Sequence, residues 1–127
     1  MDNAGQRQGN TLKEKSYTFA LQVVQLYRHL AQEKREFVLS KQLLRAGTSI
    51  GANVEEANQA ESKMDFVHKL SIAHKEAFET HYWLRLLRDS GYAELDTVQP
   101  LLMECEQLQR MLTASIKTAK ANRISKR

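Results

Sequence analysis

Apolar residues return every three or four positions through four successive stretches of this chain, and this repeat restricts its fold more than any other feature. Such a spacing places residues on one face of an α-helix, whereas no stretch shows the strict alternation expected of a strand. Only one proline and five glycines occur, so long helices meet few interruptions. The sequence therefore predicts an all-α protein whose helices share one hydrophobic core.

The ends of the first two helices follow from the repeat and from the residues that flank it. The first helix is predicted over 11–33, and the charged segment EKRE separates it from the second. Ser40 can cap the second helix, because its hydroxyl can accept an amide proton that the first turn leaves unpaired. The second helix is predicted to end between residues 58 and 61.

The third and fourth helices carry clearer end signals. Ser62, with an acidic residue three positions later, resembles a capping box, and Gly91 suits a left-handed cap at the end of the third helix. The fourth helix begins at Asp96 or Thr97, with Pro100 in its first turn, where a missing amide costs little. The predicted core seams are Leu12, Ser16, Phe19, Val23, Leu26 and Leu30; Leu43, Ala46, Ile50, Val54 and Ala57; Phe66, Leu70, Ala73, Ala77, Leu84 and Leu87; and Leu101, Cys105, Leu108, Leu112 and Ile116.

Four helices joined by short loops favour an antiparallel, up-down-up-down four-helix bundle. A chain of 127 residues is one domain by length. We expect the bundle over 11–120, between a disordered N-terminal tail at 1–10 and a basic C-terminal tail at 121–127.

The second helix has unusually small side chains in its middle. Each glycine costs about 1 kcal/mol of helix propensity relative to alanine, and close contact with a neighbouring backbone can offset that loss. The residues predicted to allow this close packing are Ala46, Gly47, Gly51 and Ala52.

Polar residues form a second pattern on the second and third helices. Their helical spacing predicts a network beside the core that fixes the register of the helices. A carboxylate metal centre is not favoured, because none of the four histidines follows a glutamate by three positions. The predicted network comprises Arg45, Ser49, Asn53, Glu56, Glu76 and Glu79.

Large apolar residues widen the apolar face of the third helix beyond the single row of residues that the core requires. Tyr82 and Trp83 could stack on nucleic-acid bases, but packing in the core or in an interface is favoured for aromatics beside leucines. Excess apolar surface on a small bundle predicts a partner chain, with Tyr82, Trp83 and Leu86 as interface candidates. We therefore expect a homo-oligomer.

Charge is distributed unevenly along the chain. Residues 1–106 hold 13 Lys/Arg and 15 Asp/Glu, a balance of −2, whereas 107–127 hold six Lys/Arg and no acid. Such a segment can attract the phosphates of RNA or DNA, or it can complement the helix dipole and keep the chain end solvated. The candidate nucleic-acid-binding residues are Arg110, Lys117, Lys120, Arg123, Lys126 and Arg127.

Several functional classes lack their signals. The single cysteine, Cys105, cannot form an internal disulfide, and no segment is long and apolar enough for a membrane span or a signal peptide, which predicts a cytoplasmic protein. Glycine-rich phosphate loops, nucleophile elbows and Cys/His pairs are also absent from the sequence. We expect no enzyme activity, no cofactor, no metal and no small-molecule substrate.

Two segments together resemble a known family. QLLRAGTSIGANVEEA and SKMDFVHKLSIAHKEAFETHYWLRLL are similar to the bacterial four-helix-bundle proteins first linked to intervening sequences in 23S ribosomal RNA genes. The family pattern Arg-Ala-x-x-Ser-Ile-x-x-Asn-hydrophobic-x-Glu falls on Arg45, Ala46, Ser49, Ile50, Asn53, Val54 and Glu56. The second family segment falls on Phe66, Leu70, Ile72, Ala73, Glu76, Glu79, Thr80, Tyr82, Trp83 and Leu84.

The resemblance implies an antiparallel bundle, and related proteins, including the accessory protein of diversity-generating retroelements, look like ring-shaped homopentamers. It also implies small residues at 47, 51 and 52. This chain departs from many relatives at 55–58, where it reads EEAN instead of Glu-Gly and a basic loop, which removes positive charge there.

A pentamer would carry 5 × 4 = +20 charges, since one chain carries +4. Multivalent cationic surfaces suit phosphate backbones. The expected function is therefore a non-enzymatic oligomeric module that binds RNA or another nucleic acid. The alternative is a protein scaffold or adaptor whose basic end serves only solubility.

Overall fold

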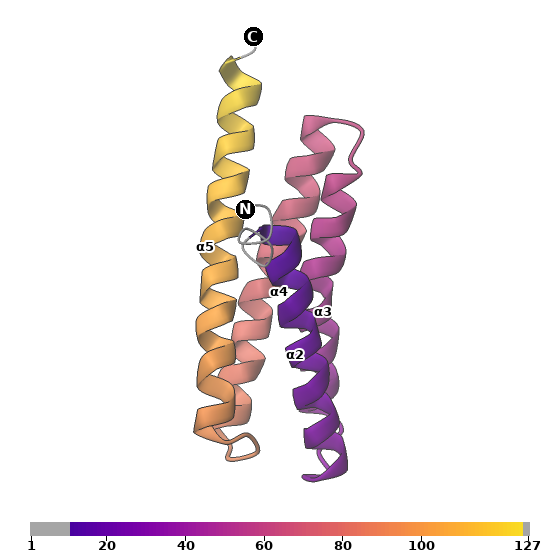
Figure 1. The fold of residues 1–127 in the computed structure, drawn as a ribbon, viewed down its shortest axis with the longest axis vertical. Coiled ribbons are helices and arrows are strands. Elements are labelled where there is room, and N and C mark those ends of the chain that lie inside the picture. The colour runs from indigo at the N-terminus through magenta and orange to yellow at the C-terminus, as the bar shows by residue number, and fades with distance from the viewer. Residues whose placement is uncertain (1–10, 126–127) are drawn as a thin grey trace, which may run out of the picture.

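The computed structural model describes residues 11–125 and contains four helices in an antiparallel bundle. The chain runs alternately down and up through the bundle, as Figure 1 shows, so the predicted all-α class and helix order are confirmed. The segment 1–10, expected as a tail, lies outside the described residues, as do Lys126 and Arg127. The helices are α2 (Leu12–Gln32), α3 (Leu39–Asn58), α4 (Lys63–Asp89) and α5 (Leu95–Ser125).

Each helix packs against its two neighbours, and the contact between α2 and α5 is the least extensive. The core is formed by the predicted seams: Phe19, Leu43, Ile50 and Leu84 are almost completely buried. Ile116 of α5 is only half-buried and packs against the edge of this core. No helix between residues 11 and 125 combines the length and apolar character needed to cross a bilayer.

Most predicted helix ends are confirmed. The Ser62 hydroxyl accepts a hydrogen bond from the Asp65 amide at 3.0 Å at the start of α4. Gly91 has a φ of +86°, and the Tyr92 amide donates to the Leu87 carbonyl at 3.1 Å. Together with the bond from the Gly91 amide to the Arg88 carbonyl at 3.1 Å, this hydrogen bond closes the last turn of α4 in the manner of a Schellman cap, which requires a left-handed residue.

The predicted cap of α3 is wrong. Ser40 lies inside the helix, where its hydroxyl donates to the Glu36 carbonyl at 2.7 Å. The Glu36 carboxylate instead accepts the amide protons of the first turn, from a position before the helix begins. The chain reaches this position through Arg35, whose φ is +56°.

The fourth helix is longer at both ends than predicted. It begins at Leu95, so Asp96 and Thr97 lie within its first turn. It also continues to Ser125, five residues into the segment 121–127 expected as a tail. Its C-terminal turns extend past the ends of α3 and α4, as Figure 1 shows.

The small residues of α3 allow α2 to approach closely. A Cβ atom at Gly47 would lie 2.8 Å from Val23 Cγ1, and one at Gly51 would lie 3.3 Å from the Ser16 carbonyl oxygen. Ala46 is fully buried. Ala52, also predicted for this contact, is exposed, because one residue beyond Gly51 is a rotation of about 100° around the helix.

The Cys105 thiol is expected to resist alkylation in the folded protein. Its Sγ atom is buried and donates to the Ala77 carbonyl at 3.2 Å. Burial, with a smaller effect from the Glu106 charge, raises the pKa of Cys105 to about 12 from 9.0. Because the thiolate is the reactive form, iodoacetamide should react about a thousandfold more slowly than with the unfolded chain. Mass spectrometry with and without urea measures this ratio, and equal rates would contradict it.

Candidate nucleic-acid interface

The described basic residues of the C-terminal segment lie on the exposed surface of α5. Arg110, Lys117 and Lys120 are all exposed, and no ion pair within residues 11–125 involves them. The side chain of Arg123 is not described, and Lys126 and Arg127 lie outside the described residues. Three positive charges on α5 therefore remain available for a ligand.

The nearest acid along α5 forms no ion pair with this surface. Glu106 lies one turn before Arg110, and its carboxylate contacts His81 Nε2 of α4 at 2.9 Å. No acidic residue follows it in the sequence. Cations without a paired carboxylate create a local positive potential that attracts phosphate groups.

Arg110 and Lys117 line a hollow of about 450 Å³ between α4 and α5. They lie seven residues apart, or two helical turns, so they share one side of α5. Phe78 of α4 forms the opposite wall, and 55% of its surface is exposed. Gln109, Thr113 and Ala114 complete the lining.

His74 supports the aromatic wall of this hollow. Its ring packs edge-on against Phe78, with centroids 5.0 Å apart, and its Nε2 atom lies 2.9 Å from Thr113 Oγ1. The sequence analysis missed Phe78 and His74. Phe78 lies next to the seam residue Ala77 and therefore points away from the core, and this offset is the signal that could have identified it.

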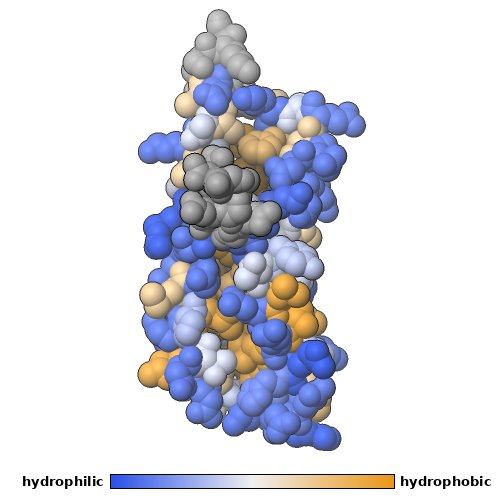
Figure 2. Space-filling view, in the orientation of Figure 1, coloured by the Kyte–Doolittle hydropathy of each residue, from blue (hydrophilic) through white to orange (hydrophobic). Residues whose placement is uncertain are grey.

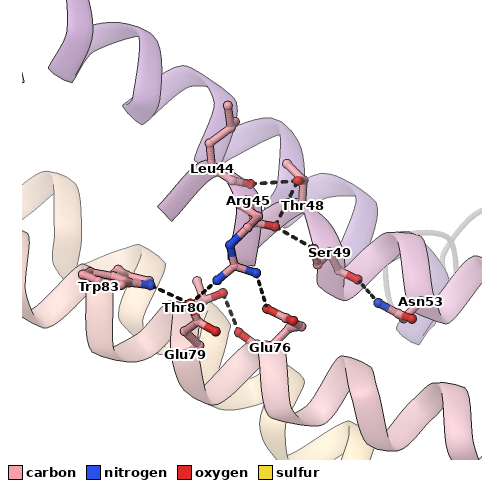
Figure 3. A network of polar contacts seen from close by, with 9 residues as sticks. All are labelled: Leu44, Arg45, Thr48, Ser49, Asn53, Glu76, Glu79, Thr80 and Trp83. Carbon is pink, nitrogen blue, oxygen red and sulfur yellow. Dashed lines mark hydrogen bonds and ion pairs between the residues drawn. The ribbon is translucent and has the colours of Figure 1, made fainter. Parts of the chain in front are cut away.

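The polar network of α3 and α4 is smaller than predicted. Arg45 forms ion pairs with Glu76, at 3.3 Å, and with Glu79, and Trp83 Nε1 donates to Glu79 Oε2 at 3.0 Å (Figure 3). One cation thus faces two carboxylates, so this surface does not attract phosphate. Arg45 is 48% exposed and Glu79 33% exposed, which limits the stability that these pairs contribute.

The other predicted network members lie elsewhere. The Ser49 hydroxyl donates to the Arg45 carbonyl, and the Asn53 amide donates to the Ser49 carbonyl (Figure 3). Glu56 pairs with Lys69 of α4 at 2.8 Å. Ser49 and Asn53 therefore satisfy the backbone of their own helix, and Glu56 joins α3 to α4 about three turns away from Arg45.

The predicted interface residues are exposed to different extents. Tyr82 is half-exposed and lies under the Arg85 guanidinium at 5.9 Å, whereas Trp83 packs against the core and Leu86 is half-buried. A further apolar surface lies on α2, where Tyr17 and Leu21, four residues apart, are 62% and 49% exposed. In Figure 2, hydrophobic surface lies over the middle of α2 and beside it, and smaller hydrophobic areas lie elsewhere on the same face.

Other parts of the described chain are weaker candidates for a functional site. A larger hollow of about 680 Å³ lies between the α3–α4 turn and the end of α5, but Glu61 and Lys63 line it with opposite charges. Within residues 11–125, no group of three or more His, Cys, Asp or Glu residues could hold a metal ion.

Comparisons with known proteins place this fold in a family. Among solved structures, a crystal structure of a protein with unknown function from the S23 ribosomal protein family of Bacteroides thetaiotaomicron shares 47% identity, with a TM-score of 0.83. That match covers 84% of this chain and 99% of the other chain. No curated protein matches.

A family model described as 23S rRNA-intervening sequence protein matches residues 9–114. The match includes Phe78 and Arg110 and ends before Lys117, so part of the basic segment lies beyond it. The chain belongs to the 23S rRNA-intervening sequence protein family.

Proposed function

We propose that this protein is a non-enzymatic, homo-oligomeric module that binds RNA, chiefly through the phosphate backbone. The observation that carries the proposal is the part of α5 after Glu106, which has no acidic residue and on which Arg110, Lys117 and Lys120 are exposed and unpaired. The family's description, which refers to 23S rRNA, is consistent with an RNA ligand. Binding through phosphates tolerates many sequences and weakens as salt rises.

Self-association would strengthen such binding. Tyr17 and Leu21 leave apolar area on α2 that a second copy could cover, and Tyr82 adds a separate exposed aromatic. An assembly, of which a pentamer is our expectation, would present one basic surface per chain to the same RNA. Native mass spectrometry with and without RNA measures the number of copies.

Neutralising Arg110 and Lys117 is expected to weaken RNA binding about tenfold at about 50 mM salt. If each side chain contacts one phosphate, Arg110→Gln combined with Lys117→Gln lowers the slope of log affinity against log salt by about 1.4 for a single strand. Fluorescence anisotropy with a short labelled RNA measures both quantities. The matched control is Lys41→Gln, an exposed lysine without an ion pair on α3.

Absence of any RNA or DNA affinity at about 50 mM salt would refute the proposal, because backbone attraction is strong there. The apolar surface at Tyr17 and Leu21 favours a second candidate function, a scaffold that recruits a protein. Deleting residues 117–127 separates the two candidates. Loss of RNA binding with an intact oligomer supports the RNA-binding module, and an unchanged set of partners supports the scaffold.

A further inference from the structure

We infer that the hollow between α4 and α5 is a subsite for an unpaired nucleic-acid base, so that the protein prefers single strands to duplexes. This inference rests on the proposed function and adds the class of nucleic acid and the residues that select it. In the arrangement that the structure indicates, a base stacks on Phe78 while Arg110 and Lys117 hold the flanking phosphates.

The aromatic wall has the properties of a stacking surface. Phe78 is more exposed than Tyr82 although it has no polar atom of its own to interact with water. His74 holds the ring from one side by an edge-on contact, and Thr113 in turn holds His74. A phenyl ring fixed in position and open to solvent can stack on any base, because every base has a π-face.

The cations decide between a base and an apolar protein side chain as the occupant. An apolar group over Phe78 would displace water from Arg110 and Lys117 and give them no partner, which is unfavourable for charged groups. A nucleotide covers the ring and supplies phosphate oxygens to both cations. The hollow therefore matches a nucleotide better than a protein side chain.

The geometry also separates single strands from duplexes. Arg110 and Lys117 are seven residues apart, about 10 Å along the helix axis, with the hollow between them. A single strand that follows this path can turn one of its bases towards Phe78. Bases in a duplex are paired and stacked inside, so a duplex reaches the cations but not the ring.

Replacing Phe78 with leucine is expected to reduce affinity for single-stranded RNA about tenfold and to leave duplex affinity unchanged. Phe78→Trp is expected to keep single-strand binding, because indole also stacks. The matched control is Phe37→Leu, a half-exposed phenylalanine before α3 and outside the hollow. Anisotropy titrations use a labelled single-stranded RNA and the same strand annealed to its complement.

Two results would overturn the inference and remain distinguishable. If Phe78→Leu changes neither affinity, or both equally, while the Arg110 and Lys117 variant still weakens binding, the base subsite is wrong and the RNA-binding function stands. If neither the single strand nor the duplex binds at about 50 mM salt, the proposed function fails and the inference fails with it.

Discussion

Replacing Gly47 with valine is expected to lower the free energy of unfolding by about 3 kcal/mol. Even a single added Cβ atom would lie 2.8 and 2.9 Å from the two Cγ atoms of Val23 and 3.2 Å from its Cβ. Val23 is fully buried and β-branched, so its methyl groups cannot rotate away. The backbones of α2 and α3 would have to separate, which would loosen the contacts on both sides of them.

Gly51, one turn further along α3, provides the control for this experiment. A Cβ at Gly51 would lie 3.3 Å from the Ser16 carbonyl oxygen, so Gly51→Ala requires a smaller shift than any side chain at Gly47 and should change the stability much less than Gly47→Val. Urea denaturation measures each variant. Val23→Ala should recover part of the stability lost in Gly47→Val, because it removes the methyl groups that clash. A Gly47→Val protein as stable as the original chain would show that the helices are not in close contact.

The fold was largely predictable because it depends on local patterns. The repeats of apolar residues identify the buried side of each helix without any knowledge of its neighbours. Gly91 could be assigned to a helix end because few other residues tolerate its backbone conformation. The small residues around Gly47 indicated a close neighbour, although the identity of that neighbour, Val23 of α2, depends on how two helices align.

The candidate site was less predictable because it depends on the register between helices. Arg110 and Lys117 can be identified from charge alone. Phe78 belongs to the site only because α4 packs beside α5, which the sequence of either helix does not show. Helical spacing likewise grouped Glu56 with Arg45, whereas Lys69 of the facing helix is its actual partner. Spacing within a helix shows which residues share a side, and it does not show what faces them.

Replacing Glu36 with alanine is expected to lower the free energy of unfolding by about 2–3 kcal/mol. Its carboxylate accepts hydrogen bonds from the amides of Val38 at 3.1 Å, Leu39 at 2.9 Å and Ser40 at 2.7 Å. These amides have no partner within α3, and the residue is only 8% exposed, so water cannot fully replace the carboxylate. Glu33→Ala is the control, since Glu33 is exposed and three residues earlier, and it should change stability by less than about 0.5 kcal/mol.

The effect of Glu36 should also depend on pH. Burial raises the pKa of this carboxyl group. The hydrogen bonds from Leu39, Ser40 and Val38 together lower the pKa by more than burial raises it, so the net pKa lies below its usual 4.5. The folded protein then binds fewer protons at this site than the unfolded chain does, and stability rises with pH through this range. The difference between Glu36 and Glu36→Gln should be largest above pH 4.5 and shrink as the pH falls through the folded-state pKa. A difference that stays constant between neutral and acidic pH would mean that the charge does not cap the helix, because an uncharged acceptor would then serve α3 equally well.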